Sequence, residues 1–234
     1  MAMPKGTSVV IPAYNEAIDI ASCLEAFSKQ TVAPKEIIVV DNNCTDDTVK
    51  IASSFPLVRI VKEKNKGITY ARTAGFNAAK YDIIARTDAD TIVTPDWIET
   101  IEKHFNEDST LQGITGAVSA RELSPGSTQW FKSLSAFTRW VARVAIKYDR
   151  QYPLMVGHNM AVRRSAWQQV APHVHLGDKD INEDVDASLF IQSVGKVAFF
   201  KDMVVKTRLM EMFFHPRKQL GYKHSIMHTL DLHK

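Results

Sequence analysis

Short apolar segments alternate with segments of helical periodicity over the first 120 residues. Apolar runs of strand length occupy residues 7–12, 36–41, 57–61, 81–87 and 112–120. Between the first two runs, Ile20, Leu24 and Phe27 recur at the spacing of one helix face. Strands that alternate with helices form a mostly parallel sheet with helices on both faces. The sequence therefore predicts a Rossmann-like α/β fold with a mixed, mostly parallel sheet.

After residue 120 the alternation becomes less regular, but no linker divides the chain. The further predicted elements are a helix at 130–147, a strand at 154–162, a helix at 184–193, a strand at 196–205 and a basic helical tail at 208–234. The sequence contains no internal repeat, low-complexity stretch or Ser/Gly-rich segment that would mark a boundary. We therefore predict a single domain over residues 1–234.

Composition places the chain among globular proteins that fold without cross-links. Of its 234 residues, 45% are apolar and 24% are charged, far from the composition of a disordered chain. Cys23 and Cys44 are too few for a disulfide framework and lack the spacing of metal ligands. No apolar signal-peptide segment precedes the first strand, and no run approaches the ~18 apolar residues of a membrane-spanning helix. We therefore expect a cytoplasmic protein.

Carboxylates stand at the ends of two predicted strands. Asp41 closes the run at 36–41, and Asp88 and Asp90 follow the run at 81–87. Ligands of open α/β sheets bind beyond the carboxyl ends of the strands, so these side chains are expected to share one crevice. On extended backbone Asp88 and Asp90 point the same way and repel each other unless a cation neutralises them. The pattern favours a Mn2+ or Mg2+ site, because such ions prefer oxygen ligands; a solvated turn is the alternative.

Six segments match a known series of sequence blocks. They are VVIPAYNE (9–16), IVVDNNCTDDT (38–48), NKGITYARTAGFN (65–77), TDAD (87–90), GHNMAVRR (157–164) and NEDVD (182–186). In this order and at these separations they resemble the family 2 glycosyltransferases, which have the GT-A fold. The resemblance implies an inverting, metal-dependent hexosyltransferase-type enzyme that moves a sugar from a UDP- or GDP-linked donor to a hydroxyl acceptor. It further implies a glycan or lipid-linked acceptor in cell-envelope glycan or glycolipid synthesis.

By this resemblance, residues 1–120 hold the nucleotide-sugar donor. The expected pocket residues are Pro12, Ala13, Tyr14, Glu16, Asp41, Lys66, Gly67, Arg72 and Asp88. Asp41 is expected to accept a hydrogen bond from the imide N–H of a uracil- or guanine-type base, since a carboxylate only accepts. Arg72 is expected near the base or the diphosphate, with a surface arginine as the alternative. Gly67 would let the backbone approach the donor closely, and a plain turn glycine is its alternative.

The metal ligands and the catalytic base are likewise implied by the resemblance. Asp90 is expected to hold Mn2+ or Mg2+ directly, with Asp88 at the ribose or at a metal-bound water. His215 lies where some GT-A enzymes place a late metal-binding histidine, and a surface histidine is the alternative. Asp184 is expected to take the proton of the acceptor hydroxyl, while Glu183 orients the acceptor. Alternatively, these two carboxylates only favour the N-terminus of a helix.

Residues 121–207 are expected to form the acceptor-binding half. The predicted helix at 130–147 has aromatic and aliphatic residues on one side, and its charged residues are all basic. Helices of this kind lie on anionic membrane surfaces, so this helix and the basic tail predict peripheral contact with the inner face of the plasma membrane. The alternative is a helix whose apolar side packs on its own domain.

Two other functions remain open at this point. A sugar nucleotidyltransferase has a related fold, but its Gly-rich loop after the first strand is replaced here by PAYNE at 12–16. A non-catalytic nucleotide-sugar-binding module would not need Asp184 at the expected position of the base. A nucleic-acid partner is disfavoured, because the net charge is only 29 − 26 = +3 and the predicted strand ends are acidic.

Overall fold

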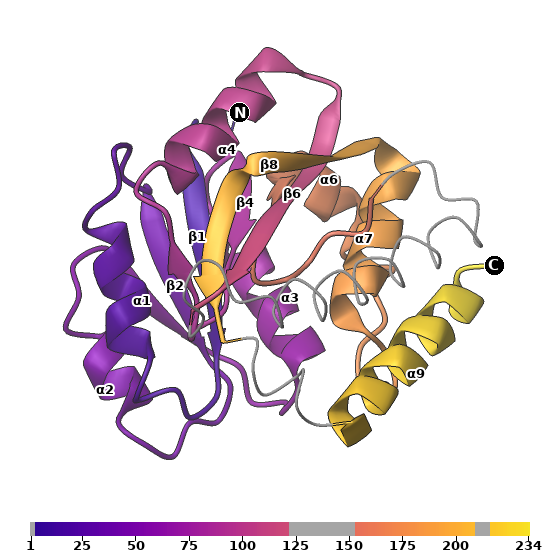
Figure 1. Ribbon diagram of the computed structural model, residues 1–234, viewed down its shortest axis with the longest axis horizontal. Coiled ribbons are helices and arrows are strands. Elements are labelled where there is room, and N and C mark those ends of the chain that lie inside the picture. The colour runs from indigo at the N-terminus through magenta and orange to yellow at the C-terminus, as the bar shows by residue number, and fades with distance from the viewer. Residues whose placement is uncertain (1–2, 122–152, 209–215) are drawn as a thin grey trace, which may run out of the picture.

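A mixed sheet of eight strands runs through the part of the protein that the computed structural model describes, residues 3–121, 153–208 and 216–234 (Figure 1). The strands are β1 (Thr7–Ala13), β2 (Glu36–Asp41), β3 (Val58–Lys62), β4 (Ile83–Arg86), β5 (Ile92–Val93), β6 (Leu111–Ala120), β7 (Met160–Arg163) and β8 (Lys196–Thr207). Their order is β3-β2-β1-β4-β7-β6-β8-β5. The pairings β1–β2, β1–β4, β2–β3 and β6–β8 are parallel, whereas β7 and β5 run antiparallel to their neighbours. The predicted mostly parallel sheet is confirmed.

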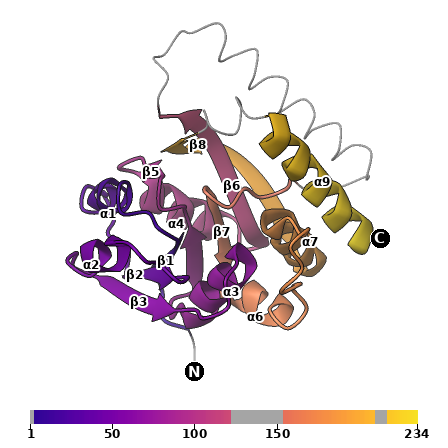
Figure 2. The same cartoon turned by 90° about the horizontal axis from the view of Figure 1, so that it is seen from below.

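Helices cover both faces of this sheet, as Figure 2 shows in end view. They are α1 (Ile20–Phe27), α2 (Thr48–Ala52), α3 (Ile68–Ala78), α4 (Trp97–Glu107), α6 (Arg164–Val170), α7 (Glu183–Val194) and α9 (Pro216–Leu232). Successive side chains of a strand point to opposite faces. In β1, Val9 and Ile11 therefore join the core under α1, α2 and α4, while Val10 joins the core under α3, α6 and α7. A strand buried on both sides is apolar throughout, which explains the continuous run in the sequence.

The C-terminal helix α9 packs against α7 (Figures 1 and 2). Val185 and Leu189 of α7 meet Ile226 and Leu230 of α9 in a small separate cluster. The predicted helix at 130–147 and the predicted metal ligand His215 lie outside the described residues. None of the helices in the described ranges is both long and apolar enough to cross a bilayer.

One predicted strand differs from the structure, and two short elements were not predicted. The strand predicted at 154–162 is wrong over most of its length, because β7 spans only Met160–Arg163. The residues before it form a loop in which Val156 bridges Asn159. The short elements β5 and α6 were not predicted, since so few residues carry no measurable periodicity.

Gly75 allows α3 to pack closely on the sheet. A Cβ placed there would lie 2.3 Å from Val10 Cγ1 and 2.9 Å from Val40 Cγ2, so the branched side chains of two neighbouring strands leave no room for it. We expect Gly75→Ala to lower the free energy of unfolding by ~1–3 kcal/mol, the usual cost of overpacking a core. Urea denaturation measures this change.

Gly221→Ala is the matched control, because, apart from its chain neighbours and the backbone of its own helix, no atom of the described residues lies within 4 Å of a Cβ added to that glycine on α9. Since alanine has a higher helix propensity than glycine, this variant should be as stable as the parent chain or up to ~1 kcal/mol more stable. Equal stability of Gly75→Ala and the parent chain would contradict the close packing of α3 on β1 and β2.

Candidate active site

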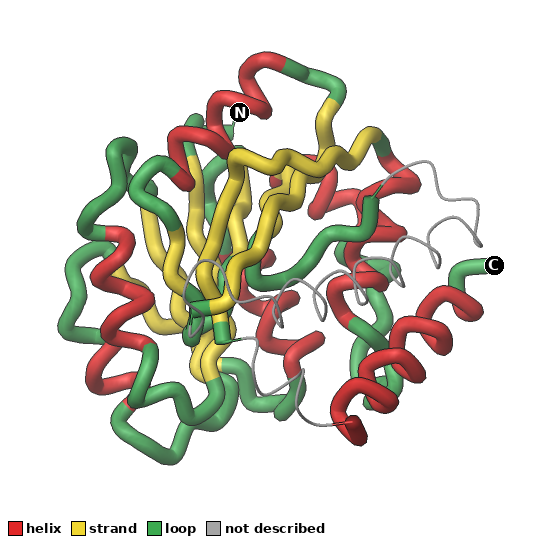
Figure 3. The backbone as a smooth tube through the Cα atoms, in the orientation of Figure 1, coloured by secondary structure: helices red, strands yellow, loops and turns green. Residues whose placement is uncertain are grey.

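A cavity of about 420 Å³ opens beyond the carboxyl ends of β1 and β4. These strands are parallel neighbours, so the loops that follow them leave the same edge of the sheet (Figure 3). The lining residues are Pro12, Ala13, Tyr14, Glu16, Asn42, Lys66, Gly67, Ile68, Ala71, Arg86, Asp88, Ala89, Asp90, Glu183 and Asp184. Every site residue predicted from the sequence is among them except Asp41, Arg72 and His215. The volume lies in the usual range for small-molecule sites.

Asn42 anchors the loop that forms one wall of the cavity. Its Oδ1 accepts the N–H of Gly67 at 2.8 Å, and its Nδ2 donates to the Asn65 carbonyl at 2.7 Å. Gly67 has a φ of 145°, a conformation that other residues rarely adopt. Beside it, Lys66 Nζ lies 2.7 Å from Tyr14 Oη and 4.1 Å from the centroid of that ring. The wall thus combines an ammonium group, which can pair with phosphate, and an aromatic ring.

Asp41 ends β2 next to this wall but does not line the cavity. Its Oδ1 accepts the N–H of Cys44 at 2.9 Å. The following residue, Asn42, faces the cavity instead, because consecutive side chains at a strand end point in different directions. Sequence analysis did not single out Asn42, although it lies in the same matched segment. A contact between Asp41 and the donor base stays a prediction.

Three carboxylates of the cavity are crowded together. Burial raises the pKa of Glu16 to about 7, and the charges of Asp90, Asp19 and Asp88 add to the shift. The pKa of Asp90 is also raised, first by burial and then by Asp88, although Thr207 and Thr91 donate hydrogen bonds to Asp90 at 3.1 and 3.2 Å. Raised pKa values of this kind indicate that too little positive charge lies near Glu16 and Asp90. A hard divalent cation bound by carboxylate oxygens would correct this imbalance, so the residues present fit Mn2+ or Mg2+.

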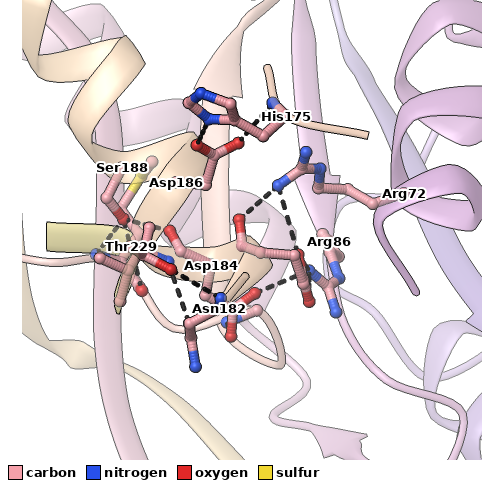
Figure 4. A network of polar contacts seen from close by, with 12 residues as sticks. Arg72, Arg86, His175, Asn182, Asp184, Asp186, Ser188 and Thr229 are labelled. Carbon is pink, nitrogen blue, oxygen red and sulfur yellow. Dashed lines mark hydrogen bonds and ion pairs between the residues drawn. The ribbon is translucent and has the colours of Figure 1, made fainter. Parts of the chain in front are cut away.

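Arg86 joins the end of β4 to the start of α7 (Figure 4). Its guanidinium is buried and donates to the carboxylates of Glu183 at 2.7 Å, Asp184 at 2.8 Å and Asp88 at 3.1 Å. Gly157 leaves room for the guanidinium and for Asp184, since a Cβ there would lie 2.6 Å from Arg86 Cζ and 2.3 Å from Asp184 Oδ1. Sequence analysis missed Arg86, although a charged residue at the end of an apolar strand was a usable signal.

The pKa values of the two carboxylates at the start of α7 are shifted in opposite directions. Burial raises the pKa of Glu183 despite the two neighbouring guanidinium groups. Burial acts on Asp184 in the same direction, but Arg86 and the Gly157 N–H, which donates to Asp184 Oδ2 at 2.7 Å, hold its pKa below the ordinary value. At neutral pH Asp184 is therefore an ionised carboxylate in the cavity wall.

Arg72 does not line the cavity, contrary to its expected place beside the donor. It is fully buried on α3 and donates to the backbone carbonyl of Glu183 and, at 3.3 Å, to the Glu183 carboxylate (Figure 4). Its guanidinium therefore supports the first turn of α7 from behind. Asn182 caps the same turn, because its Oδ1 accepts the Val185 N–H at 3.1 Å. The ionised Asp184 carboxylate lies in this first turn, where a negative charge also favours the helix dipole.

The model of "Glycosyl transferase family 2" matches residues 8–170, more than half of the chain. The chain belongs to glycosyl transferase family 2. Among curated members, an uncharacterized glycosyltransferase of Escherichia coli, YibD, is 36% identical over 105 residues, which cover 43% of this chain and 30% of that protein. The hyaluronan synthase of Pasteurella multocida is 35% identical over 108 residues, 44% of this chain and 11% of the synthase.

Solved structures confirm the GT-A fold predicted from the resemblance. Glucosyl-3-phosphoglycerate synthase from Mycobacterium tuberculosis, solved with Mn2+, UDP-glucose and phosphoglyceric acid, superposes with a TM-score of 0.70 at 18% identity, covering 98% of this chain and 79% of the synthase. A mannosyltransferase from Pyrobaculum calidifontis, solved with GDP-mannose and Mn2+, gives a TM-score of 0.67 at 20% identity, covering 100% and 65% of the two chains. At these identities the likeness establishes the fold. The chain matches only a third or less of the length of the two curated relatives named above.

Proposed function

We propose that this family 2 domain transfers a sugar, with inversion, from a UDP- or GDP-linked donor to a hydroxyl acceptor. The proposal rests on one wall of the cavity. There, carboxylates that have too little positive charge near them lie beside the ionised carboxylate of Asp184. Glu16 and Asp90 have raised pKa values, whereas Asp184 has a lowered pKa. A cation site and a proton acceptor in the same wall are the two groups that such a transfer needs.

In this proposal Asp90 holds Mn2+ or Mg2+ with Asp88 beside it, and His215 is a further candidate ligand. The bound ion would neutralise negative charge that grows on the leaving diphosphate. Lys66 supplies a second positive charge on the donor side of the cavity, and Tyr14 offers its ring to the nucleotide. The raised pKa of Glu16 supports the same cation, because binding it would favour the ionised carboxylate.

Asp184 acts on the acceptor. The acceptor oxygen attacks the anomeric carbon, the bond from that carbon to the diphosphate oxygen breaks, and the hydroxyl proton passes to the Asp184 carboxylate. Glu183, whose pKa is raised, orients the acceptor beside Asp184 and is itself positioned by Arg72 and Arg86. Residues 1–120 form the donor half and residues 121–207 the acceptor half in this proposal. A glycan or lipid-linked acceptor of the cell envelope, and membrane contact through 130–147 and the tail, stay predictions.

A thermal-shift screen of UDP-, GDP-, dTDP- and CDP-sugars with and without Mn2+ tests the proposed donor. We expect UDP- or GDP-sugars to raise the melting temperature, and to do so much more when Mn2+ is present. Nucleoside triphosphates plus sugar 1-phosphates form a second arm. Stabilisation and diphosphate release only in that arm would indicate a nucleotidyltransferase. Donor binding without any transfer, in the presence of a broad acceptor panel, would indicate a binding module.

Asp90→Ala should lose the part of the donor's thermal shift that depends on Mn2+, because the variant removes the proposed direct ligand. Calorimetric titration of the donor with and without Mn2+ measures the same loss as an affinity. Asp180→Ala is the control, since Asp180 is an exposed carboxylate outside the cavity. Unchanged Mn2+-dependent donor affinity in Asp90→Ala would remove Asp90 as the metal ligand.

A further inference from the structure

A second group of metal-ligating side chains meets at α7, outside the lining of the donor cavity (Figure 4). Asp186 is completely buried, and its Oδ1 accepts from His175 Nδ1 at 2.7 Å and from His233 Nε2 at 2.8 Å. Its Oδ2 accepts the backbone N–H of His175 at 3.1 Å, which fixes the plane of the carboxylate. Asp186 is two residues after Asp184, so the two side chains leave α7 in nearly opposite directions.

We propose that His175, Asp186 and His233 form a Zn2+ site. The three ligand atoms lie within 4.8 Å of one another, and two imidazole nitrogens with a carboxylate oxygen are a ligand set that Zn2+ favours. Bonds of ~2.0–2.1 Å to a tetrahedral ion separate the ligand atoms by roughly 3.3 Å. Each imidazole nitrogen, now 2.7 or 2.8 Å from Oδ1, therefore has to move away from that oxygen, and the two nitrogens, which lie within 4.8 Å of each other, have to take up the same separation. The fourth ligand is water, because three protein ligands leave one position open.

The surroundings of this group suit a bound ion. The His175 side chain is 37% exposed, which gives an ion a path to the buried carboxylate. The Phe190 ring lies 4.5 Å from the His233 ring and 5.7 Å from the His175 ring, so an apolar group shields the other side. The hydrogen bond from the His175 backbone to Oδ2 orients the carboxylate while Oδ1 remains directed at both imidazoles.

The three ligands come from separate parts of the chain. His175 precedes α7, Asp186 lies in its first turn, and His233 directly follows α9. Zn2+ at this point would tie α9 to α7, in addition to the small apolar cluster that already joins the two helices. It would therefore stabilise the folded state by binding to it alone. This role is independent of the proposed sugar transfer.

Calorimetric titration of the EDTA-treated full chain with ZnCl2 tests the proposal. We expect one Zn2+ to bind per chain at this site and to raise the melting temperature. Asp90→Ala should still bind this Zn2+, which distinguishes the site from the metal site proposed for the donor. CoCl2 should give the visible absorption of tetrahedral Co2+. The double variant His175→Gln/His233→Gln should bind at least tenfold more weakly and lose this absorption, whereas His228→Gln, whose histidine contacts Asp178 at 3.0 Å, should not change.

Circular dichroism of the metal-free variants checks that they fold. His175→Gln alone changes a partly exposed side chain, so it tests the site even if the double variant unfolds. The proposal is overturned if the parent chain takes up no Zn2+, if His175→Gln and the double variant bind Zn2+ as the parent does, or if Asp90→Ala abolishes all Zn2+ binding.

Discussion

Asp184→Asn is expected to reduce the rate of sugar transfer by about 10²- to 10⁴-fold, the usual contribution of a general base. Asparagine has nearly the same shape and can still accept the Gly157 N–H, but it cannot take the proton of the acceptor hydroxyl. Donor affinity should change little, since the metal and nucleotide contacts are assigned to other residues. The initial rate of nucleoside diphosphate release, with the donor and acceptor found by screening, measures the effect.

Asp180→Asn makes the same chemical change at an exposed position and should leave the rate unaltered. Calorimetric titration with the donor should give comparable affinities for Asp184→Asn and the parent chain. Parental turnover in Asp184→Asn would exclude Asp184 as the base. A rate loss that merely followed a loss of donor affinity would instead assign Asp184 to donor binding.

Arg86→Leu is expected to lower the free energy of unfolding by ~3–5 kcal/mol, the usual cost of removing one partner of a buried ion pair. The variant leaves Glu183 and Asp184 next to each other in a buried place without the guanidinium that now contacts both at 2.7 and 2.8 Å. Urea denaturation at neutral pH measures the change. The stability of Arg86→Lys should lie between that of the parent chain and that of Arg86→Leu, because a lysine keeps the charge but cannot contact three carboxylates in the same geometry.

The effect of Arg86→Leu should also depend on pH. The pKa of Asp184 is lowered in the folded state, so its ionised form stabilises the protein above its ordinary pKa of about 4, and this stabilisation is lost as the pH falls through the lowered value. Without Arg86 the pKa of Asp184 rises. The stability difference from the parent chain should therefore narrow under acid conditions, and the acid limb of any remaining activity should move to higher pH.

Arg164→Leu removes a guanidinium whose hydrogen bond to the Lys80 carbonyl, at 3.3 Å, is exposed. Its expected effect on stability is within about 0.5 kcal/mol, as for most surface substitutions. If Arg86→Leu were no more destabilising than Arg164→Leu, the three carboxylates could not depend on Arg86 for their charge balance.

Much of the donor side of the site could be predicted from short segments. The runs at 7–12 and 36–41 are apolar because both faces of their strands are buried, and the residues after β1 and β4 necessarily leave the same edge of a parallel sheet. Asp88 and Asp90 could therefore be placed at this edge from the strand pattern, whereas Glu16 was placed there only by the family resemblance, and Asp41, expected beside them, does not line the cavity. The start of the region at 154–162 could not, because Met155 is buried in a loop, and the strand begins only at Met160.

The sequence alone determined the alternation of strands and helices, the edge of the sheet at which ligands bind, and the position of Asp88 and Asp90 at that edge. Each of these follows from periodicity and position over a few residues. Only the tertiary structure showed that Arg86 joins three carboxylates, that Arg72 lies behind the first turn of α7, and that His175 and His233 meet at Asp186. These contacts join segments up to 111 residues apart. Local patterns record which side chains are buried, but which charges meet inside the core depends on how distant elements pack.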